Sequence, residues 1–334
     1  MNYIQEQYGF GGVPAAQYGA IRDSEKKQLR RQSIRAGLCL LAFSLIQWVL
    51  VQLLRSFPAL INLYQSSSAV ADVIEMFLYL CGMFLPFYIA YQLMSVQEKE
   101  VCDIFGKPTS AAAAVAAVVA CFFFCTIGDY ATNGLLDFME NAGFEVDGGI
   151  YESPTNIMEM IGGILQIAIL PAFVEEFALR SVILQPMRRF GDRYAILMSA
   201  FVFAIMHGNL VQIPFAFIAG IAFGYYTIAT SSIWVGVLAH FLNNLYSVIL
   251  NYLVEVNPTA ADTVYQIILS MTLVGGVLCV VLFWKVLPHH KLNKPASTLS
   301  GGETTAVYIF TLPMVAAIIY MVVQTVMLIH YVGH

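Results

Sequence analysis

Charged residues are scarce in this chain. Only 11% of its 334 residues are Asp, Glu, Lys or Arg, whereas 59% are apolar, and the mean hydropathy is +0.73. Soluble globular domains carry about 25% charged residues. The shortage of charge therefore excludes a soluble domain and predicts a protein that lies within a membrane.

Sequence signals of several other protein classes are missing. The start of the chain has neither a positively charged segment nor an apolar core, so no cleavable signal peptide is predicted. The cysteines form no Cys-x-x-Cys pattern of the kind that binds metal. We find no internal repeat, so an inverted-repeat transporter gains no support. The His-Glu-x-x-His helix of zinc proteases and the Gly-x-Ser-x-Gly turn of serine hydrolases are absent.

The chain has long apolar runs instead. A helix needs about 20 residues to cross the hydrocarbon core of a membrane, and backbone groups in lipid must be satisfied internally. The runs therefore predict an all-α polytopic transmembrane helical bundle of about eight to nine spans. The shortest run, 194–208, ends where Gly208 and Pro214 interrupt the pattern. The nine runs are 36–54, 73–95, 110–130, 157–179, 194–208, 212–230, 233–253, 264–287 and 306–332.

Basic residues predict the orientation of the bundle. Lys and Arg in short loops stay on the cytoplasmic side, and they cluster before the first run, after the fourth run and after the eighth run. The N-terminus is therefore expected in the cytoplasm, and nine spans place the C-terminus outside. Segment 131–156 contains five acidic residues and no Lys or Arg, and the same count places it outside.

Six polar side chains interrupt the central apolar runs. An ionisable residue inside a membrane costs much free energy, so it is a functional-site hypothesis by default. Residues four apart lie on the same helix face, and the spacing repeats in three places, which predicts a site built from three helices. The six residues are Glu175, Glu176, Arg180, His207, His240 and Asn244.

The two glutamates are expected to differ in role. Glu176 and Arg180 are four apart in the favourable order for an intrahelical ion pair, which indicates a structural role. Glu175 points about 100° away from Glu176 on the same helix. Its carboxylate is therefore free to take a proton from water.

The two histidines add the remaining groups of a candidate catalytic site. Either one alone would be an ordinary hydrogen-bonded core histidine, but together with Glu175 and Asn244 they offer a base, an imidazole and neutral oxyanion donors. Two mechanisms remain open: water activated by Glu175 alone, or water on a Zn²⁺ ion held by Glu175, His207 and His240. We favour the metal-independent route because the motifs supply no four-ligand set.

Other polar and aromatic residues receive simpler interpretations. Asp129 has no second intramembrane Asp to form a catalytic pair, so it is expected to lie at the membrane interface. Gly220 and Gly224 are expected to let neighbouring helices approach closely. The Phe and Tyr residues of segment 201–226 could line an apolar groove, but most are expected to face lipid.

The three motifs resemble those of the CPBP family of intramembrane endopeptidases, also called the ABI family. They read Glu175-Glu176-Phe-Ala-Leu-Arg180, Phe203-Ala-Ile-Met-His207 and His240-Phe-Leu-Asn-Asn244. The family includes the eukaryotic type II CAAX prenyl proteases and bacterial proteins linked to bacteriocin processing or self-immunity. The resemblance implies that Glu175 and His207 activate the attacking water, while His240 and Asn244 stabilise the oxyanion. Glu176 and Arg180 would hold the helix end.

The apolar runs, the basic residues and the resemblance together divide the chain. The expected parts are a cytoplasmic N-terminal tail (1–35), N-terminal transmembrane helices with an outer loop (36–156), a catalytic core of four central helices (157–252), which is the part that the resemblance covers, and C-terminal transmembrane helices (253–334). The expected partners are membrane lipid and a hydrophobic or lipidated peptide or protein, and no nucleic acid. The expected location is the plasma membrane of a bacterium. The alternative is a non-proteolytic protein for bacteriocin self-immunity or for peptide or ion transport.

Overall fold

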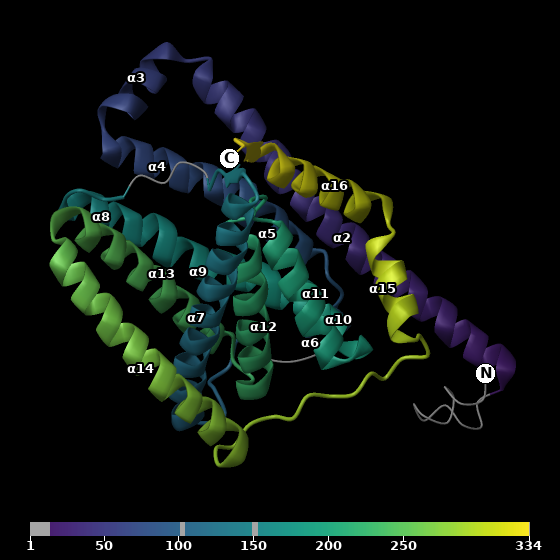
Figure 1. The fold of residues 1–334 in the computed structure, drawn as a ribbon. Helices are drawn as coiled ribbons and strands as arrows, with labels where there is room; N and C mark the ends of the chain where they lie inside the picture. The colour runs from purple at the N-terminus through teal and green to yellow at the C-terminus, as the bar shows by residue number, and fades with distance from the viewer. Residues whose placement is uncertain (1–13, 101–103, 149–152, 334) are drawn as a thin grey trace.

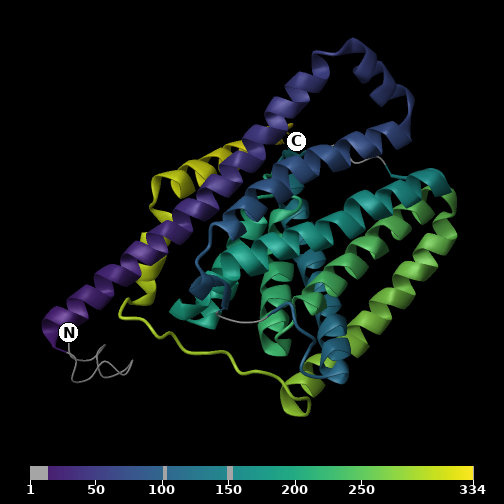
Figure 2. The same cartoon turned by 180° about the vertical axis from the view of Figure 1, so that it is seen from behind.

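The chain folds into a helical bundle (Figures 1 and 2), which confirms the predicted all-α polytopic class. The computed structural model describes residues 14–100, 104–148 and 153–333. The N-terminal half contains α2 (Ala15–Arg55), α3 (Pro58–Ser66), α4 (Ser68–Tyr79), η1 (Leu80–Phe84), α5 (Leu85–Gln92), α6 (Val96–Glu100), α7 (Ala111–Asn141) and β1 (Phe144–Val146). The central part contains α8 (Ile157–Gly163), η2 (Ile164–Ile169), α9 (Leu170–Glu176), η3 (Phe177–Leu184), α10 (Gln185–Met187), η4 (Arg188–Phe190), α11 (Asp192–Ile205), α12 (Ile213–Thr230) and α13 (Ile233–Val256). The C-terminal part contains α14 (Pro258–Lys285), α15 (Gly301–Ile309), α16 (Leu312–Met327) and β2 (Ile329–Tyr331).

Seven helical stretches in the described part of the chain are long and apolar enough to cross a membrane. Helices α15 and α16 would make an eighth span together, but the chain bends by 77° between them. The fifth predicted run, 194–208, does not form a full span, because α11 has only 14 residues. It ends before Gly208, whose φ of +63° lies in the left-handed region that breaks a helix. The protein is therefore a multi-pass integral membrane protein with fewer full spans than nine.

Three π-helical segments interrupt two of the apolar helical stretches, Ser68–Gln92 and Ile157–Phe190. Segments η1, η2 and η3 each end two residues before a proline, namely Pro86, Pro171 and Pro186. Proline has no N–H to donate to the carbonyl four residues earlier, and its ring displaces that carbonyl. A π turn accommodates the displaced backbone, and such turns are frequent at functional sites. Glu175 and Glu176 lie between the second and third of these segments.

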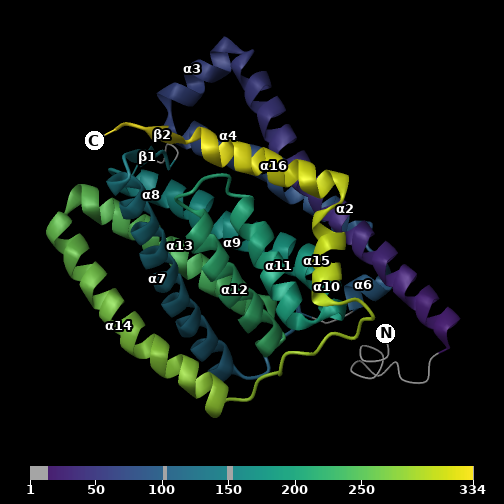
Figure 3. The same cartoon turned by 45° about the vertical axis from the view of Figure 1, so that its right-hand side comes forward.

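Backbone pairing fixes which segments share a side of the bundle. Strands β1 and β2 pair antiparallel, with Phe144 opposite Tyr331, so the loop after α7 and the C-terminal end lie together (Figure 3). At the opposite end, Asp192 N–H donates to Asn293 O at 3.2 Å and His290 N–H donates to Ala229 O at 2.8 Å. The expected grouping of loops is therefore present. Which group faces the cytoplasm stays a prediction.

A labelling experiment tests that orientation. In a background without other reactive cysteines, Glu140→Cys is expected to react with a membrane-impermeant maleimide added outside intact cells, because positive loops stay inside. Lys291→Cys is the control and is expected to react only after the membrane is opened. The reverse pattern at both positions would mean that the bundle is inverted.

The N-terminal helix begins earlier than expected. Helix α2 starts at Ala15, so the predicted tail 1–35 is helical from residue 15 onward, and residues 1–13 lie outside the described part of the chain. Buried Glu25 accepts hydrogen bonds from Ser297 Oγ at 3.1 Å and from Thr298 N at 2.9 Å. Helix α2 therefore packs against the segment that leads into α15.

Helices α11 and α12 pack closely behind the site. A Cβ added to Gly220 would lie 3.0 Å from Ala200 Cα, and one added to Gly224 would lie 3.2 Å from Leu184 Cδ1. A larger residue at either position would force its neighbours to shift. The two glycines therefore lie at close helix contacts, in agreement with the packing interpretation.

Candidate active site

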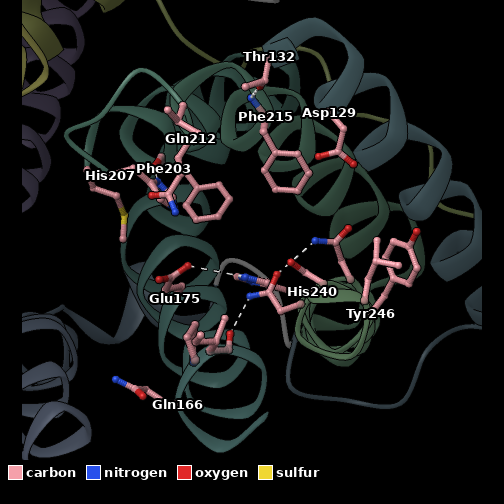
Figure 4. A pocket seen from close by; sticks show the side chains of 18 of the residues that line it. Asp129, Thr132, Gln166, Glu175, Phe203, His207, Gln212, Phe215, His240 and Tyr246 are labelled. Atoms are coloured by element: carbon pink, nitrogen blue, oxygen red, sulfur yellow. Dashed lines mark hydrogen bonds and ion pairs between the residues drawn. The ribbon is translucent and has the colours of Figure 1, made fainter. Parts of the chain in front are cut away.

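A cavity of about 1000 Å³ lies between α2, α4, α7, α9, α12, α13 and α14. Four of the six residues singled out from the sequence line it: Glu175, His207, His240 and Asn244. Figure 4 shows the first three of them. The cavity wall also includes apolar residues such as Phe203, Phe215 and Leu269 together with polar ones such as Gln166 and Asn243. The three motifs therefore meet at one cavity whose wall carries both polar and apolar side chains.

Glu175 is held by two partners from distant parts of the chain. It lies at the end of α9 and is 8% exposed. The Tyr79 hydroxyl at the end of α4 donates a hydrogen bond to Oε1 at 2.7 Å. His240 Nε2 on α13 lies 3.8 Å from Oε2. The carboxylate is thus oriented but is not neutralised by a permanent cation.

Glu176 is buried in an ion pair, as predicted. Arg180 donates from Nε to Oε2 at 2.7 Å and from Nη2 to Oε1 at 3.2 Å, and both side chains are 0% exposed. Arg180 Nη1 also donates to Ser199 Oγ at 3.1 Å and to Gly220 O at 3.4 Å. The arginine therefore connects the glutamate helix to α11 and α12.

His240 lies between the two glutamates, which the sequence did not predict. Its Nδ1 is 3.4 Å from Glu176 Oε1, while its Nε2 faces Glu175. The ring stacks on Phe223 with a centroid separation of 5.5 Å and an interplanar angle of 25°. A Cβ added to Gly236, one turn earlier, would lie only 2.7 Å from Glu176 Oε2. Glycine at that position allows α13 to approach the glutamates.

His207 lines the cavity without a hydrogen bond to Glu175 or His240 among the described residues. It follows the end of α11, and its Nδ1 lies 2.8 Å from Phe203 O. A carbonyl oxygen only accepts, so Nδ1 carries the proton and Nε2 is left as an acceptor. His207 is therefore able to take a hydrogen bond from a molecule in the cavity.

Asn244 is tied to the neighbouring span. Its Nδ2 donates to Ile167 O at 2.9 Å, and its Oδ1 accepts from Asn243 Nδ2 at 3.2 Å. Ile167 lies four residues before Pro171, so its carbonyl lacks the usual α-helical donor. The side-chain amide of Asn244 therefore donates one N–H to the Ile167 carbonyl, and its second N–H remains for another acceptor.

Several lining residues were missed or misassigned from the sequence. Asp129, which was expected at the membrane interface, lines the cavity (Figure 4), and the sequence did not predict that contact. Phe203 and Phe215 line the cavity as well, and Phe223 is buried, so the expectation of lipid-facing aromatics is wrong for them. Nothing in the sequence singled out Tyr79 as a site residue, because tyrosine is common in apolar runs.

Glu75 was also missed, although a signal existed. It is a lone carboxylate in the second apolar run, and an intramembrane charge is a functional hypothesis by default. It lines the cavity and accepts hydrogen bonds from Gln166 Nε2 and, at 2.5 Å, from the Tyr64 hydroxyl. The same rule that found Glu175 would have found it.

The described residues do not form a ready-made set of metal ligands. Among the described residues, no group of three His, Cys, Asp or Glu is placed to hold a metal ion. A histidine ligand must offer a free nitrogen lone pair. His240 Nε2 lies 3.8 Å from Glu175 Oε2, and His207 has no hydrogen bond to either residue in the described part of the chain. The metal-independent route stays a prediction, and we assign no step to a metal.

Comparison with known proteins agrees with the motif assignment. Residues 158–246, which contain all three motifs, match the family model described as Rce1-like: Type II CAAX prenyl endopeptidase Rce1-like. The match confirms the resemblance predicted from the three motifs. No curated protein and no solved structure matches the chain.

Proposed function

We propose, from the match of residues 158–246 to type II CAAX prenyl endopeptidases, that this protein is an intramembrane endopeptidase. Its substrate would be a membrane-associated, hydrophobic or lipidated peptide. The observation that carries the proposal is the environment of Glu175. Its carboxylate lies on the cavity of about 1000 Å³ between the apolar helices, oriented by Tyr79 and facing His240.

In the proposed reaction, Glu175 acts as the general base. A water molecule in the cavity donates one proton to the Glu175 carboxylate and a hydrogen bond to His207 Nε2, and its oxygen attacks the scissile carbonyl carbon. The carbonyl oxygen becomes an oxyanion. Glu175 then passes the proton to the amide nitrogen, the C–N bond breaks, and a carboxylic acid and an amine leave.

His240 and Asn244 are the proposed oxyanion donors. His240 Nε2 lies 3.8 Å from Glu175, which is too long for a hydrogen bond, so it is available to a substrate oxygen. Asn244 offers its second N–H beside it. Donors that are fixed before the reaction stabilise developing charge without reorganisation.

Asn244→Ala tests the oxyanion role. An oxyanion donor acts mainly in the transition state, so kcat is expected to fall by about 10²–10³ with little change in KM. Asn251→Ala, on the same helix but outside the cavity wall, is the control and should leave both constants unchanged. If only the folded yield fell, Asn244 would have a structural role through its hydrogen bond to Ile167 and would not be an oxyanion donor.

Mass analysis of peptides tests the proposed function as a whole. The purified protein in lipid vesicles is incubated with a mixture of hydrophobic peptides, with and without a prenyl group. Wild type should produce fragment pairs whose masses add up to the peptide plus one water, and Glu175→Ala should produce none. Peptide binding or transfer across the vesicle without any fragment would instead support the immunity or transport function.

A further inference from the structure

A second pocket of about 310 Å³ lies between α7, α11, α12, α14 and the loop that leads to α15. It shares no lining residue with the cavity that contains Glu175. Leu197 and Trp284 of its wall are 48% and 59% exposed, so the pocket opens at the surface of the bundle. Its volume is within the range of about 300–1,000 Å³ that is usual for small-molecule sites.

Helix periodicity separates this pocket from the candidate active site. Ile221 and Tyr225 are four apart on α12, so they turn one face of the helix to the pocket. The other side of α12 carries Gly224, where an added Cβ would lie 3.3 Å from Arg180 Nη1. Helix α12 therefore stands between the pocket and the buried ion pair, and the proposed reaction uses none of the pocket's residues.

The pocket lies at the end of the bundle that the basic loops are expected to place in the cytoplasm. Helices α12 and α14 end on this side (Figure 1), and His290 N–H donates to Ala229 O beside them. Trp284 is one residue before the end of α14, and its ring lies 6.3 Å from that of Tyr225. Tryptophan and tyrosine are enriched where a span meets the lipid headgroups. The pocket is therefore placed beside acyl chains, with headgroups at its rim.

The rim of the pocket is positively charged. Arg193 is the one charged side chain among the described residues of the wall, and it is exposed. It has no ion pair within the described part of the chain, and its neighbour Asp192 pairs instead with Arg188 at 2.7 Å. Two exposed lysines, Lys285 and Lys291, are direct chain neighbours of lining residues. An apolar pocket with cations and no carboxylate in its described wall is complementary to an anionic lipid.

We propose that this pocket binds an anionic phospholipid of the membrane, with an acyl chain between α11, α12 and α14 and its phosphate on Arg193. A guanidinium group can donate two parallel hydrogen bonds to a phosphate, and basic pockets between spans on the cytoplasmic side bind anionic headgroups. The apolar wall favours a lipid over a soluble phosphate compound, which would leave that surface exposed to water. The inference goes beyond the proposed function and does not rest on it.

Trp284 reports directly on the pocket, because it lines the wall and the chain has only 3 tryptophans. The full chain with Trp48→Phe and Trp234→Phe is placed in phosphatidylcholine bilayers, and brominated phosphatidylglycerol or brominated phosphatidylcholine is added in steps. Bromine quenches tryptophan fluorescence on contact. We expect half of the quenching of Trp284 at an about fivefold lower mole fraction of the anionic lipid than of the neutral lipid.

Two controls separate the pocket from a general attraction of anionic lipid to the basic end. Trp234 lies at the start of α13, outside the pocket. As the single tryptophan, it should be quenched by the two lipids at mole fractions within about twofold of each other. In the Trp284 protein, Arg193→Gln should reduce the preference below about twofold. Arg55→Gln, at an exposed arginine outside the pocket, should keep the full preference.

Retention of lipid gives a second readout if the tryptophan variants do not fold. The Arg193→Gln protein with its tryptophans intact should carry about fivefold less anionic phospholipid through purification than wild type, as measured by mass spectrometry. Equal quenching of Trp284 by the two lipids, or unchanged retention in Arg193→Gln, would overturn the inference. Relief of the quenching by a prenylated peptide would assign the pocket to the lipid group of a substrate and would overturn it as well.

Discussion

Replacement of Glu175 by Gln is expected to lower kcat for peptide cleavage by about 10³–10⁴. The amide has nearly the same shape, and it can still accept from Tyr79 through its carbonyl oxygen. It cannot take a proton from water at neutral pH, so the attacking hydroxide does not form. Initial rates on one cleavable peptide, measured with saturating peptide in lipid vesicles, give the ratio.

The control for this experiment removes a carboxylate elsewhere. Glu145→Gln changes an exposed residue of β1 and should leave kcat unchanged. The folded yield and the thermal midpoint of Glu175→Gln should match those of wild type. A loss of cleavage below tenfold, with the protein fully folded, would show that Glu175 is not the base.

Arg180→Met is expected to lower the free energy of unfolding by about 3–5 kcal/mol. The change leaves the Glu176 carboxylate buried without its cation, and it removes the donors to Ser199 and Gly220 that connect η3 to α11 and α12. Removing one partner of a buried ion pair costs more than the pair itself contributes. The fraction of folded protein against denaturant, measured by size-exclusion chromatography in detergent, reports the change.

Two further variants separate charge from packing at this pair. Glu176→Gln combined with Arg180→Met removes both charges and should recover part of the lost stability. Arg193→Met, at an exposed arginine at the start of α11, should change stability by less than about 0.5 kcal/mol. If the double variant were no more stable than Arg180→Met, the unpaired Glu176 charge would not explain the loss.

Local features of this fold could be predicted from the sequence. The long apolar runs predicted the helical bundle, because the membrane leaves few backbone solutions. The Glu176–Arg180 pair could be predicted because residues four apart meet on any helix. Motif spacing likewise predicted that Glu175, His207, His240 and Asn244 would share a site, and all four line one cavity.

Features that depend on tertiary packing could not be predicted. Tyr79 meets Glu175 across 96 positions of the chain, and no local pattern encodes that contact. His240 approaches Glu176 because Gly236 lets the helices come together, which becomes evident only when α13 is seen beside α9. The π segments before the prolines shift the helical phase, so ideal helix geometry fails there. The place of Asp129 on the cavity wall could not be predicted, because proximity to a span end does not say which way a side chain faces.

The central claim is that the chain's own glutamate activates water for peptide hydrolysis, and one measurement tests it most directly. Cleavage of a single peptide by wild type and by Glu175→Gln is followed side by side after exhaustive chelation of metal ions, with and without added Zn²⁺. We predict that chelated wild type retains its full rate, that Glu175→Gln is inactive, and that Zn²⁺ changes neither result. Loss of wild-type cleavage on chelation with recovery by Zn²⁺ alone, or equal rates for the two proteins, would contradict the claim.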